Sequence, residues 1–176
     1  MLKRKRTRMH WPVAFGTTPG KPIENTPKDS NGKVILDKAL TEDPSPTWEV
    51  LESLVKKGKI KHIGISNFNI RRTEQLLRKA SIKPDVNQCE LNFSNPQPEL
   101  LKFCRENEIL LEAYSPLGST GAKEREHPEI VKIAEKHSVD PANVLISWQV
   151  HRGVVCLPKS VTPSRIESNF KGMMRN

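Results

Sequence analysis

A cluster of cationic and hydroxyl side chains lies near the C-terminus, where an apolar segment meets the start of a helix. Residues 154–157 have the length of a strand, and Pro158 ends it. The polar residues that follow are Lys159, Ser160 and Thr162, and then Arg165 and Asn169 on a helix that Pro163 opens. A strand, a polar turn and a helix start present backbone N–H groups and cations to an anion. Lys159 and Arg165 therefore indicate a phosphate site. An ordinary solvated turn is the alternative from this segment alone.

Polar residues also end the other predicted strands. From Trp48 onward, helical and strand periods alternate, with strands predicted at 60–65, 86–91, 109–114 and 154–157. Helical patterns lie near 48–58, over Leu76 and Leu77 with an end near Lys83-Pro84, from 98, and over 129–137 and 143–150. This alternation predicts a parallel α/β sheet. The side chains at the strand ends are Ser66, Asn67, Gln88, Tyr114, Ser115, Lys159 and Ser160. Such folds place their sites at that edge.

Composition narrows the class of protein. The 176 residues are 35% hydrophobic and 28% charged, which is typical of one soluble globular domain. No apolar run reaches the ~18 residues of a membrane span, and we expect no secretory signal. Five cations of the +9 net charge fall in the first eight residues. This run is a nuclear address, a nucleic-acid arm or a solvated terminus. No aromatic residues interleave with it, so we expect no nucleic-acid partner.

The cysteines and histidines favour a reduced protein without a metal. Cys89, Cys104 and Cys156 are odd in number and lie in or beside apolar runs, which predicts buried thiols and a cytoplasmic location. The five histidines lack ligand spacing, so we expect no metal site. Residues 13–46 are rich in Pro, Gly, Asn and Thr and predict a long loop, either a functional lid or a disordered segment.

Five segments in this order resemble the aldo-keto reductase family. They are His10-Trp11-Pro12, Gly64-Ile65-Ser66-Asn67-Phe68, Val86-Asn87-Gln88, Ala113 to Gly118, and Leu157 to Pro163. The resemblance implies an α/β fold, a partial (β/α)₈ TIM barrel comprising roughly the C-terminal half. It places the barrel at residues 10–176, after a basic stub at 1–9 that is foreign to the fold. It also implies reduction of aldehydes and ketones with NADPH.

The resemblance assigns roles residue by residue. His10 matches the histidine that orients the substrate carbonyl, and Trp11 matches a wall of the substrate pocket. Ser66, Asn67 and Gln88 match the groups that bind the nicotinamide carboxamide, and Tyr114 matches the ring that stacks on it. Ser115, Leu117 and Ser119 match pyrophosphate contacts. Lys159, Ser160, Thr162 and Arg165 match the clamp on the adenosine 2′-phosphate, and Asn169 matches an adenine contact. Ser168 stands where the family often has Glu, which puts the adenine-end contact in question.

The catalytic set implied by the resemblance is incomplete. The family's proton-donating tyrosine and its aspartate and lysine partners precede the His-Trp-Pro segment, but the one tyrosine here is Tyr114. We therefore expect NADPH-dependent reduction to be impaired in this chain. The alternatives are a non-catalytic NADP-binding or protein-interaction fragment and a nuclear role through the Lys3–Arg6 run. Uncovered strand edges of a half barrel also predict self-association.

Overall fold

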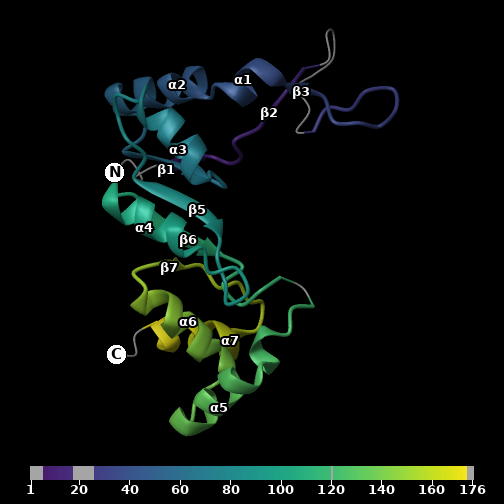
Figure 1. Ribbon diagram of the computed structural model, residues 1–176, viewed down its shortest axis with the longest axis vertical. Coiled ribbons are helices and arrows are strands. Elements are labelled where there is room, and N and C mark those ends of the chain that lie inside the picture. The colour runs from purple at the N-terminus through teal and green to yellow at the C-terminus, as the bar shows by residue number, and fades with distance from the viewer. Residues whose placement is uncertain (1–5, 18–25, 120, 174–176) are drawn as a thin grey trace. The chain divides into compact units, whose positions relative to one another are not determined.

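The computed structural model describes residues 6–17, 26–119 and 121–173. Two compact units make up the chain, Met1–Asp85 and Val86–Asn176. From Ser45 onward, strands and helices largely alternate along the sequence (Figure 1), and each unit contains at least one parallel strand pair. The predicted parallel α/β class is therefore confirmed for both units.

The first unit combines a parallel strand pair, a short hairpin and three helices. Its elements are β1 (Arg6–Met9), β2 (Ala14–Phe15), β3 (Leu36–Asp37), α1 (Lys38–Glu42), α2 (Ser45–Lys56), β4 (His62–Ser66) and α3 (Ile70–Leu77). β1 lies parallel to β4, with Arg6 beside His62 and Met9 beside Ile65. The predicted strand at 60–65 corresponds to β4, and the predicted helix near 48–58 corresponds to α2. The predicted helix over Leu76 and Leu77 corresponds to α3, which ends at Leu77 rather than near Lys83-Pro84.

An apolar core holds the first unit together. Trp48 of α2 is 1% exposed and packs in one cluster with Ile63 and Ile65 of β4 and with Leu76 of α3. Its indole Nε1–H donates to the carbonyl of Ile82 at 2.9 Å, so the buried ring leaves no unsatisfied donor. Burial of one large aromatic side chain contributes roughly 1.5–3 kcal/mol from removed apolar surface alone.

The strand β1 lies in the segment that we expected to be foreign to the fold. Arg6 and Arg8 are exposed, whereas Thr7 and Met9 are half-buried. Because side chains alternate between the two faces of a strand, both guanidinium groups face solvent while Met9 packs on the core. Residues 6–9 of the basic segment therefore form a strand of this unit. Lys3, Arg4 and Lys5 lie outside the described residues.

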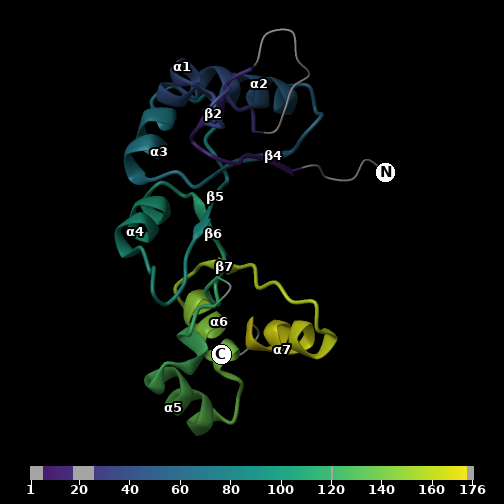
Figure 2. The same ribbon diagram turned by 90° about the vertical axis from the view of Figure 1, so that its right-hand side faces the viewer.

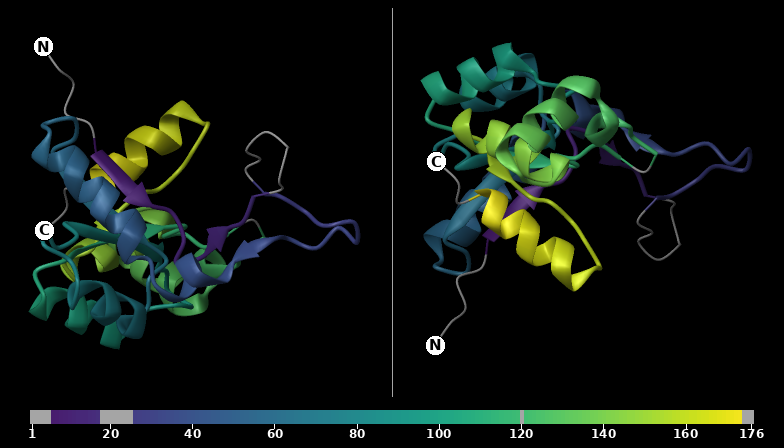
Figure 3. Two further views of the ribbon diagram at one scale, coloured as in Figure 1. Left: turned by 90° about the horizontal axis from the view of Figure 1, so that it is seen from above. Right: turned by 90° about the horizontal axis from the view of Figure 1, so that it is seen from below.

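The described residues of the 13–46 segment include a short hairpin and the helix α1. β2 and β3 pair antiparallel, with Phe15 opposite Leu36, and a further bridge joins Lys28 to Val34. The Asp29 carboxylate closes the turn by accepting from the N–H groups of Asn31 at 2.8 Å and Lys33 at 2.9 Å. Such Asx turns order polar segments that lack an apolar pattern. Within this unit, the described part of the 26–35 segment extends beyond α1–α3 (Figures 1 and 3).

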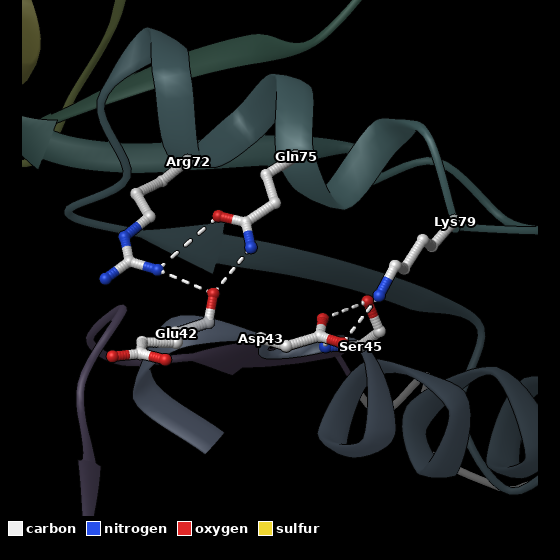
Figure 4. Close-up of polar contacts among 6 residues, drawn as sticks. All are labelled: Glu42, Asp43, Ser45, Arg72, Gln75 and Lys79. Atoms are coloured by element: carbon white, nitrogen blue, oxygen red, sulfur yellow. Dashed lines mark hydrogen bonds and ion pairs between the residues drawn. The ribbon is translucent and has the colours of Figure 1, made fainter. Parts of the chain in front are cut away.

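Side chains of α3 cap the C-terminal end of α1 (Figure 4). The carbonyl oxygen of Glu42 accepts from Arg72 Nη1 at 2.9 Å and from Gln75 Nε2 at 2.5 Å. The next residue, Asp43, accepts from Lys79 Nζ at 2.6 Å and from the Ser45 hydroxyl at 2.6 Å. These contacts satisfy a helix-terminal carbonyl that has no intrahelical partner. They also fix the junction between α1 and α2 against α3.

We expect Asp43 to make the stability of this junction depend on pH. The hydrogen bond from Lys79, followed by those from Ser45, lowers the pKa of Asp43 from 3.8 to about 2. A pKa depressed by folding contributes stability above pH 4, and that stability is lost as the pH falls from about 4 to 2. Asp43→Asn should therefore destabilise the protein at pH 7 and have almost no effect at pH 2. Urea unfolding at both pH values measures the difference.

Glu49→Gln is the matched control for Asp43. The side chain of Glu49 is exposed and makes no hydrogen bond or ion pair with any described residue. Its replacement should leave the unfolding midpoint unchanged at either pH. An equal loss for Asp43→Asn at pH 7 and pH 2 would contradict the assignment.

The second unit carries three parallel strands and four α-helices among its described residues. Its elements are β5 (Val86–Glu90), α4 (Pro98–Glu106), β6 (Leu110–Tyr114), the 3₁₀ turn η1 (Glu124–Glu126), α5 (Pro128–His137), α6 (Pro141–His151), β7 (Val155–Cys156) and α7 (Pro163–Met173). Each α-helix begins with proline, whose fixed φ suits the first helical position. β6 pairs with β5 and with β7. Within this unit, α6 lies next to β7, and α5 and α7 pack against α6 (Figures 1 and 2).

All three cysteines are free thiols and buried, as predicted. Burial raises the pKa of Cys104 and of Cys156 to about 12, and neighbouring Cys89 adds to the shift at Cys104. A thiol with so high a pKa is not nucleophilic at neutral pH. Within the described ranges, no helix is long and apolar enough to cross a membrane. The same residues hold no group of three or more acidic, histidine or cysteine side chains arranged for a metal ion.

Candidate functional site

A cavity of about 790 Å³ opens in the second unit. Three segments line it: the turn after β6, the start of α6, and the turn that leads from β7 into α7. The lining residues are Ser115, Leu117, Gly118, Ser119, Gly121, Ala122, Arg125, Asp140, Ala142, Lys159, Ser160, Ser164, Arg165, Ser168 and Asn169. The parallel pairing of β6 with β7, with Ala113 beside Cys156, brings the first and third segments together. Seven of the residues that the sequence singled out for a cofactor thus share one cavity: Ser115, Leu117, Ser119, Lys159, Ser160, Arg165 and Asn169.

The charge of this cavity favours an anion. Lys159, Arg165 and Arg125 are exposed, and their side chains make no hydrogen bond or ion pair with a described residue. Asp140 is the only acidic residue in the described lining, and its carboxylate accepts from the N–H of Ala142 at 2.8 Å. Three cations against one engaged carboxylate suit a ligand that carries more than one negative charge. Guanidinium and ammonium groups prefer phosphate in such a setting.

The backbone after β6 adopts an uncommon conformation at the cavity wall. Ser115 has φ 48° and Gly118 has φ 79°, and the Gly118 N–H donates to the Ser115 carbonyl at 2.9 Å. A Cβ on Gly118 would lie 2.4 Å from the Cβ of Ala122, so no larger residue fits there. A non-glycine residue held in the left-handed region costs of order 1 kcal/mol, and such residues cluster at functional sites.

The turn before α7 is ordered by its own hydrogen bonds. The Ser160 hydroxyl accepts from the N–H of Thr162 at 3.1 Å. The carbonyl of Thr162 in turn accepts from the N–H groups of Arg165 at 3.1 Å and Ile166 at 3.0 Å. Thr162 is not among the lining residues, although Ser160 and Ser164, two positions to either side, are. Its backbone therefore orders the turn that carries Lys159 and Arg165.

Ser168 anchors α7 to α6. The buried Asn143 donates from Nδ2 to the Ser168 carbonyl at 2.7 Å, and the Ser168 hydroxyl donates to Asn143 Oδ1 at 3.3 Å. Ser168 also lines the cavity. Ser168, the residue that departs from the family pattern, thus contributes a hydroxyl group that attaches α7 to α6.

Two predicted cofactor residues of the second unit do not line this cavity. Gln88 donates from Nε2 to Glu112 Oε2 at 2.7 Å, between β5 and β6. Tyr114 is half-buried at the end of β6, beside Glu90 of β5. Burial raises the pKa of Tyr114, and the carboxylate of Glu90 raises it further. The phenol therefore stays protonated at neutral pH, and its acidity is shifted away from that of a proton donor working near pH 7.

The first unit brings together His10, Ser66 and Asn67. Asn67 follows β4 directly in the left-handed region, with φ 63°. Its Nδ2 donates to the carbonyl of His10 at 2.9 Å and to the Ser66 hydroxyl oxygen at 3.3 Å. Trp11 is half exposed, and its ring centroid lies 5.9 Å from that of His10. Asn67 thus holds the segment that carries both residues, whose roles toward a substrate stay predictions.

Among the lining residues with charged or hydroxyl side chains, sequence reasoning missed three, Arg125, Asp140 and Ser164. Asp140 precedes Pro141 at a helix start, a recognisable N-cap signal that the structure bears out. Ser164 directly follows the proline that opens α7, so its place in the first turn was readable. Arg125 lies in a run of charged residues at 123–126 that reads as a solvated surface. Arg125 lines the cavity because of its position in the turn η1, which the sequence did not predict.

Comparisons with known proteins agree with this picture. Residues 9–175 match the aldo/keto reductase family. A glycerol 2-dehydrogenase (NADP(+)) of Hypocrea jecorina is 46% identical over 168 residues, covering 92% of this chain and 52% of that protein. An aldehyde reductase of Saccharomyces cerevisiae is 43% identical over 170 residues, covering 93% of this chain and 53% of that protein.

A solved structure shows the fold. The aldose reductase from Schistosoma japonicum matches with a TM-score of 0.85 at 35% identity, over 97% of this chain and 53% of that chain. The predicted partial (β/α)₈ barrel is thereby confirmed. The chain spans about half the length of the relatives that it matches.

Proposed function

Because this chain belongs to the aldo/keto reductase family, we propose that its second unit binds NADPH or NADP⁺ for the reduction of a small aldehyde or ketone. The observation that carries the proposal is the cavity with three cations, Lys159, Arg165 and Arg125, that are not engaged by described carboxylates. A 2′-phosphorylated dinucleotide has phosphate charge at two places, and NAD⁺ lacks the 2′-phosphate. This charge pattern therefore favours NADP over NAD.

The residues fit the parts of this cofactor. Lys159 and Arg165 would bind the 2′-phosphate, with the hydroxyl groups of Ser160 and Thr162 beside them. Ser115, Leu117 and Ser119 would contact the pyrophosphate, and Asn169 the adenine. Tyr114 would support the nicotinamide ring, and Gln88 would hold its carboxamide. The carboxamide roles that the resemblance implies for Ser66 and Asn67 of the first unit stay predictions. NADPH supplies a hydride when it is bound. These residues would orient the ring so that one face meets the carbonyl carbon.

Transfer of the proton is the step for which this chain lacks a matched residue. His10 would orient the substrate carbonyl, and Trp11 would form one wall of the pocket. The reduced oxygen also needs a proton, and Tyr114 is the one tyrosine of the chain. Its raised pKa and its proposed place under the nicotinamide do not suit that task. Loss of a positioned proton donor lowers rates by about 10²–10⁴, so we expect slow reduction.

A second candidate function is binding without turnover. The single tyrosine favours it, because the cavity keeps its cations while the general acid has no matched residue. In that case the protein is an NADP-binding or protein-interaction module. β7 supports self-association, because in the described second unit it pairs only with β6 and exposes Val155. A cytoplasmic location suits the three thiols, and tagging with and without residues 1–8 tests the nuclear alternative.

We expect the purified full chain to bind NADP⁺ more tightly than NAD⁺. Calorimetric titration with both nucleotides measures this preference, and a reaction with NADPH and a reactive aldehyde followed by absorbance measures turnover. No binding of NADP⁺ at millimolar concentration would overturn the proposed cofactor. Rapid multiple turnover would instead contradict the expectation that reduction is slow for want of a proton donor. Binding without any turnover would support the second candidate function, an NADP-binding module.

A further inference from the structure

Arg125 has no role in the resemblance to the family, yet it lines the cavity with its side chain uncommitted. It is exposed and makes no hydrogen bond or ion pair with a described residue. It belongs to η1, which continues the wall formed by Ser115, Leu117 and Ser119. Lys159 and Arg165 come from the other segment, which leads into α7. The cavity therefore has cations on two different segments.

The two residues before Arg125, Lys123 and Glu124, do not line this cavity. Lys123 and Glu124 line a second cavity of about 560 Å³, together with residues of the 90–95 segment. Glu124 is 7% exposed, and its Oε1 accepts from the N–H of Ser94 at 3.2 Å. Successive side chains of a 3₁₀ turn are about 120° apart. With Glu124 held inward on one side, the next residue is turned toward the other cavity.

Backbone hydrogen bonds keep this arrangement in place. The N–H of Glu126 donates to the carbonyl of Lys123 at 2.9 Å, and the N–H of His127 donates to that of Glu124 at 3.2 Å. The carboxylate of Glu124 also lies 3.3 Å from the point that a Cβ on Gly118 would occupy. Glu124 thus ties η1 to the 90–95 segment and lies close to the turn after β6, and it sets where the Arg125 side chain begins.

We propose that Arg125 is a further cofactor-binding residue, that it binds the pyrophosphate of the dinucleotide, and that Glu124 positions it. This inference rests on the proposed function. A guanidinium group offers paired donors that match phosphate oxygens. Arg125 shares its wall with the residues proposed for the pyrophosphate, whereas the 2′-phosphate is left to Lys159 and Arg165. Arg125 therefore serves NADP⁺ and NAD⁺ alike.

The test compares Arg125→Gln with wild type in the full chain, by calorimetry with NADP⁺ and NAD⁺ and by competition with adenosine 2′-monophosphate. The affinities for both dinucleotides should fall by the same factor, about tenfold for one charge-assisted phosphate contact. Affinity for adenosine 2′-monophosphate, which has no pyrophosphate, should not change. Unchanged circular dichroism and melting temperature establish that the exposed substitution leaves the fold intact.

Lys123→Gln is the matched control, because it removes one positive charge from the adjacent residue, which does not line this cavity. It should leave dinucleotide affinity unchanged. Glu124→Gln keeps an oxygen that can accept from Ser94 and should retain affinity, whereas Glu124→Ala should lose it for both dinucleotides. Rescue by the amide distinguishes positioning from a general loss of charge.

Three results would overturn the inference. The first is an Arg125→Gln variant whose affinity for both dinucleotides equals that of wild type. The second is an equal loss of dinucleotide affinity in Lys123→Gln, and the third is a loss of adenosine 2′-monophosphate binding in Arg125→Gln. Each leaves the proposed function standing as long as wild type binds NADP⁺. If wild type binds neither NADP⁺ nor adenosine 2′-monophosphate, both the proposed function and the role of Arg125 are wrong.

Discussion

Replacing Lys159 and Arg165 together with glutamine is expected to weaken NADP⁺ binding on the order of 100-fold, since two contacts to charged groups are lost. The affinity for NAD⁺ should change little, because the two side chains are proposed to bind the phosphate that NAD⁺ lacks. The preference for NADP⁺ should therefore disappear. Calorimetric titration of wild type and variant with both nucleotides gives the ratio directly.

A control with the same change in net charge is available on α5. Lys132 and Lys136 are exposed, have no partner among the described residues and do not line the cavity. Their double replacement by glutamine should leave both affinities unchanged. An equal loss in this control would mean that the overall positive field attracts the nucleotide. An equal loss for NADP⁺ and NAD⁺ in the Lys159/Arg165 variant would move these cations away from the 2′-phosphate.

Trp48→Ala should destabilise the protein by about 3–5 kcal/mol, as expected when a buried aromatic ring is removed from a core. Trp48 is 1% exposed, and its loss would leave a cavity beside Ile63 and Ile65. It would also remove the donor that satisfies the Ile82 carbonyl. Urea unfolding followed by far-UV circular dichroism measures the change without depending on tryptophan fluorescence.

Two further variants keep this prediction open to refutation. Trp48→Phe retains most of the packing but not the indole N–H, so its loss should be smaller and measurable even where the alanine variant does not fold. Val50→Ala lies on the same helix at a side chain that is 59% exposed, and it should change stability by less than about 0.5 kcal/mol. Similar losses for Trp48→Phe and Val50→Ala would show that the ring is not central to the core.

Local periodicity predicted most helices and strands, because the forces that form them act between near neighbours in the sequence. The proline at the start of each helix of the second unit and the apolar run of each predicted strand lie within a few residues of the element they define. Accordingly, α2, β4, β5, α4, β6, α5 and α6 appear close to where the sequence placed them. β7 is confirmed but shorter, with only Val155–Cys156 paired to β6.

Two structures of the first unit that the sequence did not predict both depend on pairing with a distant partner. Arg6–Met9 is too basic to read as a buried strand, and it becomes a strand because β4 lies beside one edge. The hairpin of β2 and β3 likewise depends on a cross-strand partner and on the turn at Asp29. Neither partner can be recognised from composition, since strand pairing joins residues that are far apart along the chain.

The order of five motifs by itself determined the family, the fold class and the residues to be examined. Tertiary structure alone decided that Ser115, Lys159 and Arg165 line one cavity with Arg125, because β6 and β7 pair side by side and α7 is tied to α6 through Asn143. It also decided that Arg125 reaches that cavity while Lys123 does not, through the buried carboxylate of Glu124. Motifs record which side chains are present, whereas their convergence follows from the pairing of strands and the packing of helices.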